Sequence, residues 1–248
     1  MFKFIFYPIL FASTLVLMSH THLPSINGAH EVNPVNNFVE GKPAAFTKEA
    51  RLANYKLWNL DKIGLSQNAF ELAMKGFNYL SIKKQVTKKN IVSIVDFSKP
   101  STEKRLYVID VNTGEILFRT WVAHGQNSGE RYANKFSNSL ESHQSSLGFF
   151  ITMDTYIGGH GYSLRLKGCE KGINDKAYER DIVIHGADYV SREFINSRGV
   201  LGRSYGCPAV PAELSQQIIN TIKNGSCLFL YHPTKKYYRR SKILNSQV

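Results

Sequence analysis

Cysteine is scarce in this chain of 248 residues, which holds Cys169, Cys207 and Cys227 and no others. No two cysteines are spaced as CxxC and no two histidines as HxxxH, so the usual signatures of a zinc site are missing. We therefore expect no metal and no cofactor. The competing interpretation, a metal site, has to combine four scattered residues: His160, Cys169, His185 and Cys207.

Acidic residues are also few, with 19 Asp and Glu against 31 Lys and Arg, and the net charge is +12 with a pI near 9.5. This balance favours an anionic partner, which is a nucleic acid, an acidic membrane surface or an acidic polymer. Hydrophobic residues make up 43% of the chain and aromatic residues 12%, which argues against general disorder. We find no internal repeat.

Long apolar runs are confined to Phe4–Met18, which follows a short basic start. This run has the length of a signal-peptide core and is short for a spanning helix. We expect a signal peptide cleaved after Ala29, or else an uncleaved anchor that ties the protein to the envelope. Both interpretations place the body in the periplasm or cell envelope, which makes nucleic acid an unsuitable partner and a cell-wall polymer a suitable one.

The rest of the sequence predicts a helical piece followed by a β-rich domain. Apolar residues at helical spacing after Ser66, a good N-cap, predict a helical hairpin. Short β-branched runs then predict strands, with a long polar loop at 125–146. The expected division is 1–29 signal peptide or anchor, 30–46 linker, 47–85 helical segment, 90–232 β-rich domain and 233–248 basic, solvated tail.

The strands are expected at separate places along the domain. We predict a first strand at Ile91–Val95, a hairpin around a turn at 112–114, a strand at 147–152, a short strand near Tyr162–Leu166 among glycine-rich loops, a buried strand at Ile182–Ile184 and a last strand at Cys227–Tyr231. A helix is expected to begin at Pro211 and to end near Gly225.

Cys207 is the cysteine best suited to chemistry. It stands between Gly206 and Pro208 in a polar stretch, where small neighbours leave room for a substrate. The amides of Gly206 and Cys207 can face one point and hold an oxyanion. Arg203, four positions earlier, adds a positive potential that lowers a thiol pKa. If Cys207 is the nucleophile, Cys169 and Cys227 either pair with each other or remain two buried free thiols.

His185 is the best candidate for the base that takes the thiol proton. Glycine follows three histidines, His124, His160 and His185, and each of them can end a strand. The apolar run Ile182–Ile184 makes the strand before His185 the most convincing. The carbonyl of Gly186 can then orient the second ring nitrogen, so no carboxylate is needed.

Several segments resemble one family in the same order. IHG (184–186) followed by SYGCPAV (204–210) is similar to the signature of YkuD-type L,D-transpeptidases. RLYVIDVNTGEILFRTWVAHG (105–125) resembles the opening hairpin of that family, and SSLGFFIT (145–152) resembles one of its strands. VAHGQNSG, KFSN, GYSLRL and GRSYGCPAVP are closer still to the branch known as the murein L,D-transpeptidase catalytic domain family. The resemblance covers roughly 90–232.

The resemblance implies an α+β fold with a β-rich, sandwich-like catalytic domain, preceded here by the N-terminal helical hairpin. It implies a cysteine acyl-transfer reaction on peptidoglycan stem peptides, which serve as donor and acceptor and become joined by 3→3 cross-links. Carried over by position, Cys207 is the nucleophile, His185 the base, Gly186 the orienting carbonyl and Ser204 a support of the turn or a substrate contact. The oxyanion hole falls on the backbone of Tyr205, Gly206 and Cys207.

Two departures from the family pattern bear on substrate recognition. Tyr205 stands where the family has histidine, and Ala209-Val210 stands where it has arginine or asparagine. The carboxylate-binding role therefore passes to another cation, with Arg203, Arg165 and Arg192 as candidates. His124 and His160 either line the groove or are loop histidines with satisfied hydrogen bonds.

Two other functions fit the same sequence. The site is an L,D-carboxypeptidase if water replaces the amine acceptor. The chain is a non-catalytic murein-binding protein if its basic surface binds the wall and Cys207 is unreactive.

Overall fold

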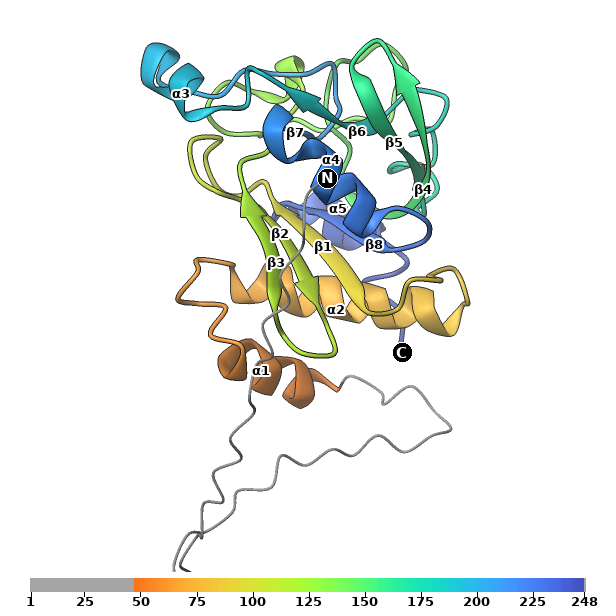
Figure 1. Cartoon of the computed structure of the whole chain (residues 1–248). Coiled ribbons are helices and arrows are strands. Elements are labelled where there is room, and N and C mark those ends of the chain that lie inside the picture. The colour runs from red at the N-terminus through yellow and green to blue at the C-terminus, as the bar shows by residue number, and fades with distance from the viewer. Residues whose placement is uncertain (1–46, 248) are drawn as a thin grey trace, which may run out of the picture. The chain divides into compact units, whose positions relative to one another are not determined.

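The computed structural model describes residues 47–247 (Figure 1), so the predicted signal peptide or anchor and the predicted linker lie outside the described residues. Among residues 47–247, no helix has both the length and the apolar character needed to cross a membrane. The helices are α1 (Lys48–Leu57), α2 (Gln67–Ile82), α3 (Arg192–Arg198), α4 (Ala212–Ile222) and α5 (Lys235–Arg240), with a 3-10 turn at Gln126–Ser128. The strands are β1 (Ile91–Asp96), β2 (Leu106–Asp110), β3 (Ile116–Thr120), β4 (Gly148–Gly158), β5 (Gly161–Gly168), β6 (Val183–Ala187), β7 (Ala209–Pro211) and β8 (Cys227–Tyr231).

The described strands form one mixed sheet in the order β3-β2-β1-β8-β4-β5-β6-β7. The pairs β1–β8 and β6–β7 are parallel, and the other neighbouring strands are antiparallel. Together with the helix pair α1 and α2, this sheet confirms the predicted α+β, β-rich, sandwich-like fold with an N-terminal helical hairpin. The strand β8 has the predicted limits, because its apolar run is buried on both faces.

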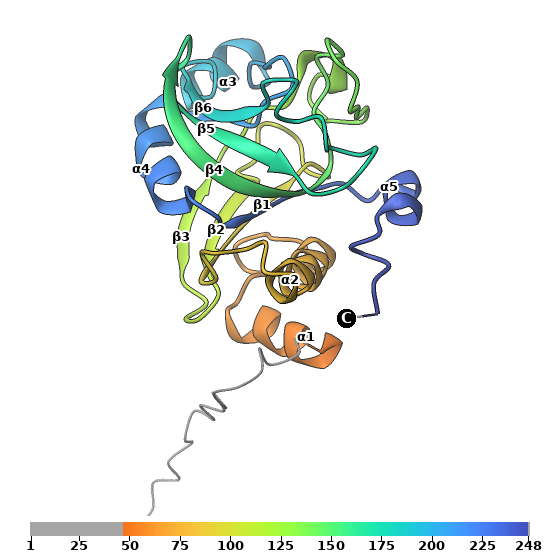
Figure 2. The same cartoon turned by 90° about the vertical axis from the view of Figure 1, so that its right-hand side faces the viewer.

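The sheet bends so far that its two edges meet (Figure 2). The segment that follows β3 reaches β7, where the amide of Ala123 donates to the carbonyl of Ala209 at 2.8 Å. Further along, Gly125 and Ser204 form an isolated parallel bridge. These bonds close the sheet into a barrel-like shape and hold the segment around Ser204 at the seam.

The long helix α2 covers the face of the sheet near β1 and β8 (Figure 2). It begins as predicted, because the Ser66 hydroxyl accepts a hydrogen bond from the amide of Ala69 at 3.1 Å. Its inner face buries Phe70, Met74 and Phe77. The helix therefore contributes core to the sheet.

The glycine-rich stretch after residue 156 forms more regular structure than the sequence predicts. The strand β4 runs on to Gly158, and β5 spans Gly161–Gly168 in place of the short strand expected near Tyr162–Leu166. Gly158 and Gly161 pair with each other at the tip of this hairpin. Gly158, Gly161 and Gly168 thus mark the ends of strands. The prediction of loops is wrong for 156–158 and 167–168, whereas 169–174 lies outside the strands as predicted.

The prediction of a solvated tail at 233–248 is also wrong for its described part. Lys235–Arg240 is helical, and Tyr237, Ile243 and Leu244 are buried. The Tyr237 hydroxyl donates to Glu170 Oε2 at 2.9 Å, and the Ser241 hydroxyl also bonds this carboxylate. Tyr237 lies among basic residues in sequence, and Ile243 and Leu244 follow the helix, so no apolar periodicity marks this segment.

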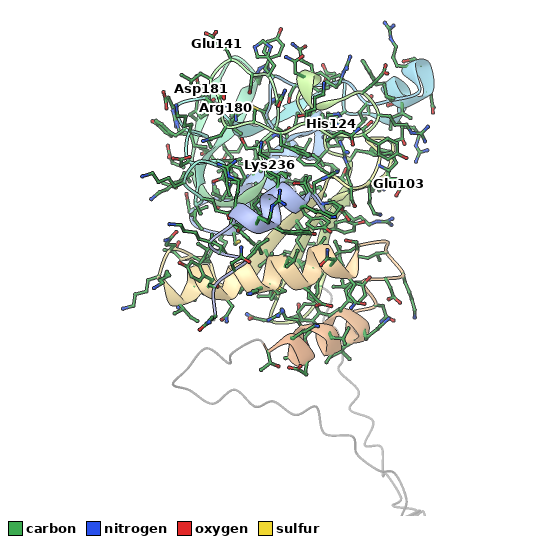
Figure 3. All side chains as sticks on the ribbon, turned by 180° about the vertical axis from the view of Figure 1, so that it is seen from behind. Glu103, His124, Glu141, Arg180, Asp181 and Lys236 are labelled. Carbon is green, nitrogen blue, oxygen red and sulfur yellow. The ribbon has the colours of Figure 1, made fainter. Side chains whose placement is uncertain are left out.

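The closing segment is fixed by a buried Arg105–His124 pair (Figure 3 labels His124). Arg105 Nη2 lies 2.8 Å from His124 Nδ1, and the same guanidinium donates to the carbonyls of Val122 and Lys99. His124 Nε2 lies 3.2 Å from the carbonyl of Gly129, which makes it the protonated nitrogen of a neutral ring. Burial, and then the charge of Arg105, lower the pKa of His124 to about 3. Burial lowers the pKa of Arg105 to about 9.

This pair predicts a loss of stability in acid. His124 has an unfolded-state pKa near 6.5, so between that value and its native pKa of about 3 the unfolded chain binds one proton more than the native protein. The free energy of unfolding should therefore fall as the pH drops from 6 to 4, by up to about 1.4 kcal/mol per pH unit from this residue. His124→Asn keeps an acceptor toward Arg105 but cannot titrate, so urea unfolding should show a shallower pH dependence. Parallel curves for the two proteins would contradict the assignment.

Candidate active site

His185 lies in the middle of β6, between two partner strands. It pairs with Ser163 of β5 and with Ala209 of β7. Val183 and Ile184 are buried, as the sequence predicts, but the strand begins one residue later than predicted and continues to Ala187, so His185 does not end it. Strand pairing on both sides fixes the backbone, so the imidazole has a defined position.

The ring of His185 is oriented by its own strand. Nδ1 lies 2.9 Å from the carbonyl oxygen of Gly186, so Nδ1–H donates and Nε2 is left as an acceptor. His160 stacks on the ring, with 4.3 Å between centroids. Burial lowers the pKa of His185, the Gly186 carbonyl raises it, and His160 lowers it again. The imidazole is therefore neutral near pH 7 and able to accept a proton.

The turn that carries Cys207 is held by short polar bonds. The Ser204 hydroxyl donates to the carbonyl of Cys207 at 2.6 Å and accepts from the amide of Gly206 at 3.1 Å. Gly206 has φ +127°, and a Cβ there would lie 2.9 Å from the carbonyl oxygen of Gln144. This position requires glycine. Ser204 thus supports the turn, which is one of its two expected roles.

The Cys207 thiol is half-buried and makes two backbone contacts. It lies 3.4 Å from the amide of Val183 and 3.5 Å from the carbonyl oxygen of Asp181. Burial raises its pKa to about 11, although the Val183 amide and Arg180 lower it. The resting site therefore holds a neutral thiol and a neutral imidazole, not a preformed ion pair.

One cleft of about 1000 Å³ contains both His185 and Cys207. Its walls carry charges of both signs. The remaining residues that line it are Gln126, Leu140, Glu141, His143, Tyr156, His160, Glu179, Arg180, Asp181, Val183, Tyr189, Arg203, Ser204 and Tyr205. A ligand with both an anionic and a cationic group fits these walls better than a purely acidic one.

The backbone amides of the turn are not equivalent. The amide of Gly206 donates to Ser204, so it is already used. Among the hydrogen bonds of residues 47–247, none involves the amide of Tyr205 or of Cys207. Of the three residues predicted for the oxyanion hole, these two have donors to spare.

Of the arginines and histidines predicted to bind substrate, some line the cleft and others lie elsewhere in the domain. Arg203 and His160 line the cleft, and Arg203 makes one long bond of 3.4 Å to the carbonyl of Gly129. Arg165 pairs with Asp154 at 2.9 Å and lies outside the cleft lining. The others are also elsewhere: His124 is fully buried against Arg105, and Arg192 stacks on Trp121.

Arg180 and His143 are cleft residues that the sequence did not indicate. Arg180 belongs to the turn before β6, and Figure 3 labels it beside Asp181. The ring of His143 stacks on Tyr205 with 4.4 Å between centroids. Both come from polar loop segments with no periodicity, where nothing local shows that a side chain returns to the thiol.

Cys169 and Cys227 are free thiols. Cys169 directly follows β5 and Cys227 begins β8, and these strands flank β4 on opposite sides, which separates the two residues by two strand spacings, about 9.6 Å. A disulfide needs Cα atoms within about 7 Å. Burial raises the pKa of Cys169 to about 12 and raises that of Cys227 well above its ordinary value. Within residues 47–247, no group of three or more His, Cys, Asp or Glu side chains is arranged to hold a metal ion.

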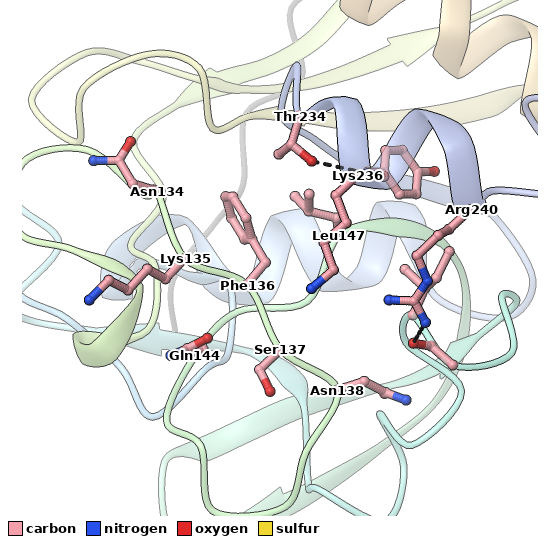
Figure 4. Close-up of a pocket in the computed structure, with 13 residues that line it drawn as sticks. Asn134, Lys135, Phe136, Ser137, Asn138, Gln144, Leu147, Thr234, Lys236 and Arg240 are labelled. Atoms are coloured by element: carbon pink, nitrogen blue, oxygen red, sulfur yellow. Dashed lines mark hydrogen bonds between the residues drawn. The ribbon is translucent and has the colours of Figure 1, made fainter.

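A second cavity, of about 490 Å³, lies between α5 and the loop at 134–147 (Figure 4). Its charged lining residues are Lys135, Lys236 and Arg240, and Phe136 and Leu147 supply apolar surface. None of the candidate catalytic residues lines it. The thiol chemistry therefore belongs to the larger cleft.

The region that matches a known family includes the sheet and the cleft. The family model described as L,D-transpeptidase catalytic domain matches residues 61–231, whereas no curated protein matches. Similar solved structures include L,D-transpeptidases from Mycobacterium smegmatis (13% identity, 58% of this chain and 59% of that one, TM-score 0.36), Stackebrandtia nassauensis (15%, 75% and 78%, 0.35) and Xylanimonas cellulosilytica (14%, 57% and 60%, 0.34).

The chain thus spans about three fifths of the Mycobacterium smegmatis structure, and similarity at this level adds nothing to the family match. The match itself covers most of the chain and includes the strands and the turn that carry His185 and Cys207. The chain belongs to the family of L,D-transpeptidase catalytic domains.

Proposed function

We propose that this protein is an exported cysteine L,D-transpeptidase that acts on peptidoglycan stem peptides through a Cys207 acyl-enzyme and forms 3→3 cross-links. The observation that carries the proposal is the shared cleft, which is lined by both the half-buried Cys207 and the oriented imidazole of His185. Export is supported by the apolar run near the N-terminus.

The first half-reaction transfers the peptide to the thiol. His185 Nε2 takes the thiol proton as sulfur attacks the carbonyl carbon of the third stem residue. The free amides of Tyr205 and Cys207 are suited to the oxyanion that forms. The C–N bond then breaks, the terminal D-alanine leaves with the proton from His185, and a thioester remains.

The second half-reaction transfers the peptide to an amine. The side-chain amine of a neighbouring stem attacks the thioester carbonyl, its proton passes to His185, and sulfur leaves and is reprotonated. The mixed charge of the cleft supports such a pair of substrates. Arg203 is suited to a stem carboxylate, and Glu141, Glu179 and Asp181 are suited to an ammonium group.

Removing the nucleophile should abolish covalent chemistry. Cys207→Ala should form no adduct with a tetrapeptide stem or a carbapenem in intact-protein mass spectrometry, whereas Cys169→Ala should keep the parental rate. His185→Ala should remain folded and acylate about 10²- to 10⁴-fold more slowly, because the general base is lost. Parental turnover by Cys207→Ala would exclude this thiol, and parental acylation by His185→Ala across pH 5–8 would transfer the base to His160.

The thiols should differ in reactivity. Below its pKa, the thiolate fraction of a cysteine rises tenfold per pH unit, so Cys207, with a pKa of about 11, should hold about ten times more thiolate than Cys169, with a pKa of about 12. Because the nucleophilicity of a thiolate falls with its pKa, Cys207 should alkylate severalfold faster. The buried Cys227 should not react. Peptide mapping after brief iodoacetamide treatment at pH 8 measures the order. Preferential labelling of Cys169 would favour the non-catalytic murein-binding alternative.

Analysis of the products identifies the acceptor, which is either an amine or water. Incubation with tetrapeptide stems and an amine acceptor should yield cross-linked peptide and free D-alanine. Without the amine, the thioester should persist or hydrolyse slowly. Tripeptide as the main product under both conditions would identify an L,D-carboxypeptidase, which uses water at the same site.

A further inference from the structure

Arg180 connects the turn before β6 to the loop at 137–146. Its guanidinium is half-buried and makes four hydrogen bonds, all to uncharged oxygens. Nη1 donates to the carbonyl of Ser137 at 2.8 Å and to the Ser146 hydroxyl at 2.6 Å. Nη2 donates to the Ser142 hydroxyl at 3.1 Å and to the carbonyl of Gln144 at 2.7 Å.

These bonds leave Arg180 little capacity for a substrate carboxylate. A guanidinium has five N–H donors, of which four lie on the two terminal nitrogens. The four bonds to the loop use those terminal donors, and Nε–H alone is left. A bidentate carboxylate contact would have to break two of them. Arg203, with one long bond, is the cation of the cleft that remains available.

The same guanidinium lies beside the catalytic turn. A Cβ added to Gly206 would be 3.4 Å from Arg180 Nη2 and 2.9 Å from the carbonyl oxygen of Gln144, to which that nitrogen donates. The Ser145 hydroxyl also donates to the carbonyl of Gly206 at 3.1 Å. The loop, the guanidinium and the turn therefore pack as one layer beside Cys207.

The charge of Arg180 is not neutralised by an ion pair. The ion pairs within residues 47–247 are Lys56–Asp61, Lys99–Glu103 and Arg165–Asp154, and none includes it. Burial lowers the pKa of Arg180, and the Cys207 thiolate raises it. Other titratable groups that face the cleft are Glu141, His143, Tyr156, His160, Glu179, Asp181, His185, Tyr189, Arg203, Tyr205 and Cys207.

We propose that Arg180 is a positioning residue for acyl transfer, which fastens the 137–146 loop against the Gly206–Cys207 turn and supplies the positive charge that stabilises the sulfur when its proton leaves. This inference rests on the proposed function. Arg180 lies outside the family motif, and it takes a physical role here. In this chain, Ala209-Val210 stands where the family has polar residues after its cysteine.

The test uses the whole protein and two alkylating reagents, neutral iodoacetamide and anionic iodoacetate. Arg180→Gln removes the charge and Arg180→Lys keeps it. Arg119→Gln is the matched control, because this exposed arginine does not line the cleft. Circular dichroism establishes that each variant is folded, and peptide mapping follows Cys207.

For Arg180→Gln we expect alkylation by iodoacetamide to fall at least threefold and alkylation by iodoacetate to fall further, so that the iodoacetate-to-iodoacetamide ratio drops severalfold. Arg180→Lys should keep the parental ratio. It should nevertheless acylate with stem peptide at least tenfold more slowly, because one ammonium with three donors cannot hold four acceptors on the loop. Arg119→Gln should match the parent in both assays.

A folded Arg180→Gln protein with the parental ratio overturns the charge assignment, and parental acylation by Arg180→Lys overturns the fastening role. If Arg180→Gln does not fold, Arg180→Lys decides both points, because a changed ratio in that variant contradicts the role of the charge. Alkylation needs no stem peptide, so the ratio remains informative even if the parent transfers no stems, which would count against the proposed function alone.

Discussion

The buried Arg105–His124 contact is the interaction on which the rest of the domain depends. A buried guanidinium is costly unless its donors are satisfied, and here they go to backbone carbonyls and one neutral imidazole. The residues so fixed lie in the segment that closes the sheet, and that segment bonds both Ala209 and Ser204. The geometry of the cysteine turn is therefore set from the first hairpin of the sheet, about 80 residues earlier in sequence.

A neutral thiol and a neutral imidazole in the same cleft have a consequence for catalysis. Charge separation has to take place during attack, so the groups that face the sulfur count more than its resting ionisation. The chain supplies them from three different places: amides of the turn, the imidazole of β6 and a cation from the preceding turn. A displacement of the stretch from Arg180 to His185 also affects the sulfur, because the thiol contacts the backbone of Asp181 and Val183.

Much of this arrangement was accessible from the sequence, where local pattern and function coincide. The limits of β8, the helix cap at Ser66, the strand that carries His185 and the glycine-flanked Cys207 all follow from short-range signals. The confirmed fold class rests on the same signals. Arg180 and the buried role of His124 were missed, because each depends on contacts between segments far apart in sequence. The C-terminal helix was missed because its six residues, KKYYRR, are basic apart from Tyr237 and Tyr238.

The hydrogen bonds of the Glu170 carboxylate bear on where the folded domain ends. It receives the amide of Phe149 at the start of β4 and hydroxyls of the C-terminal segment, while the shared family region stops at residue 231. A carboxylate buried inside the family region is thus satisfied by residues outside it. For this chain, the unit that folds is larger than the unit that is inherited in common, and the extra piece completes the core of the shared part.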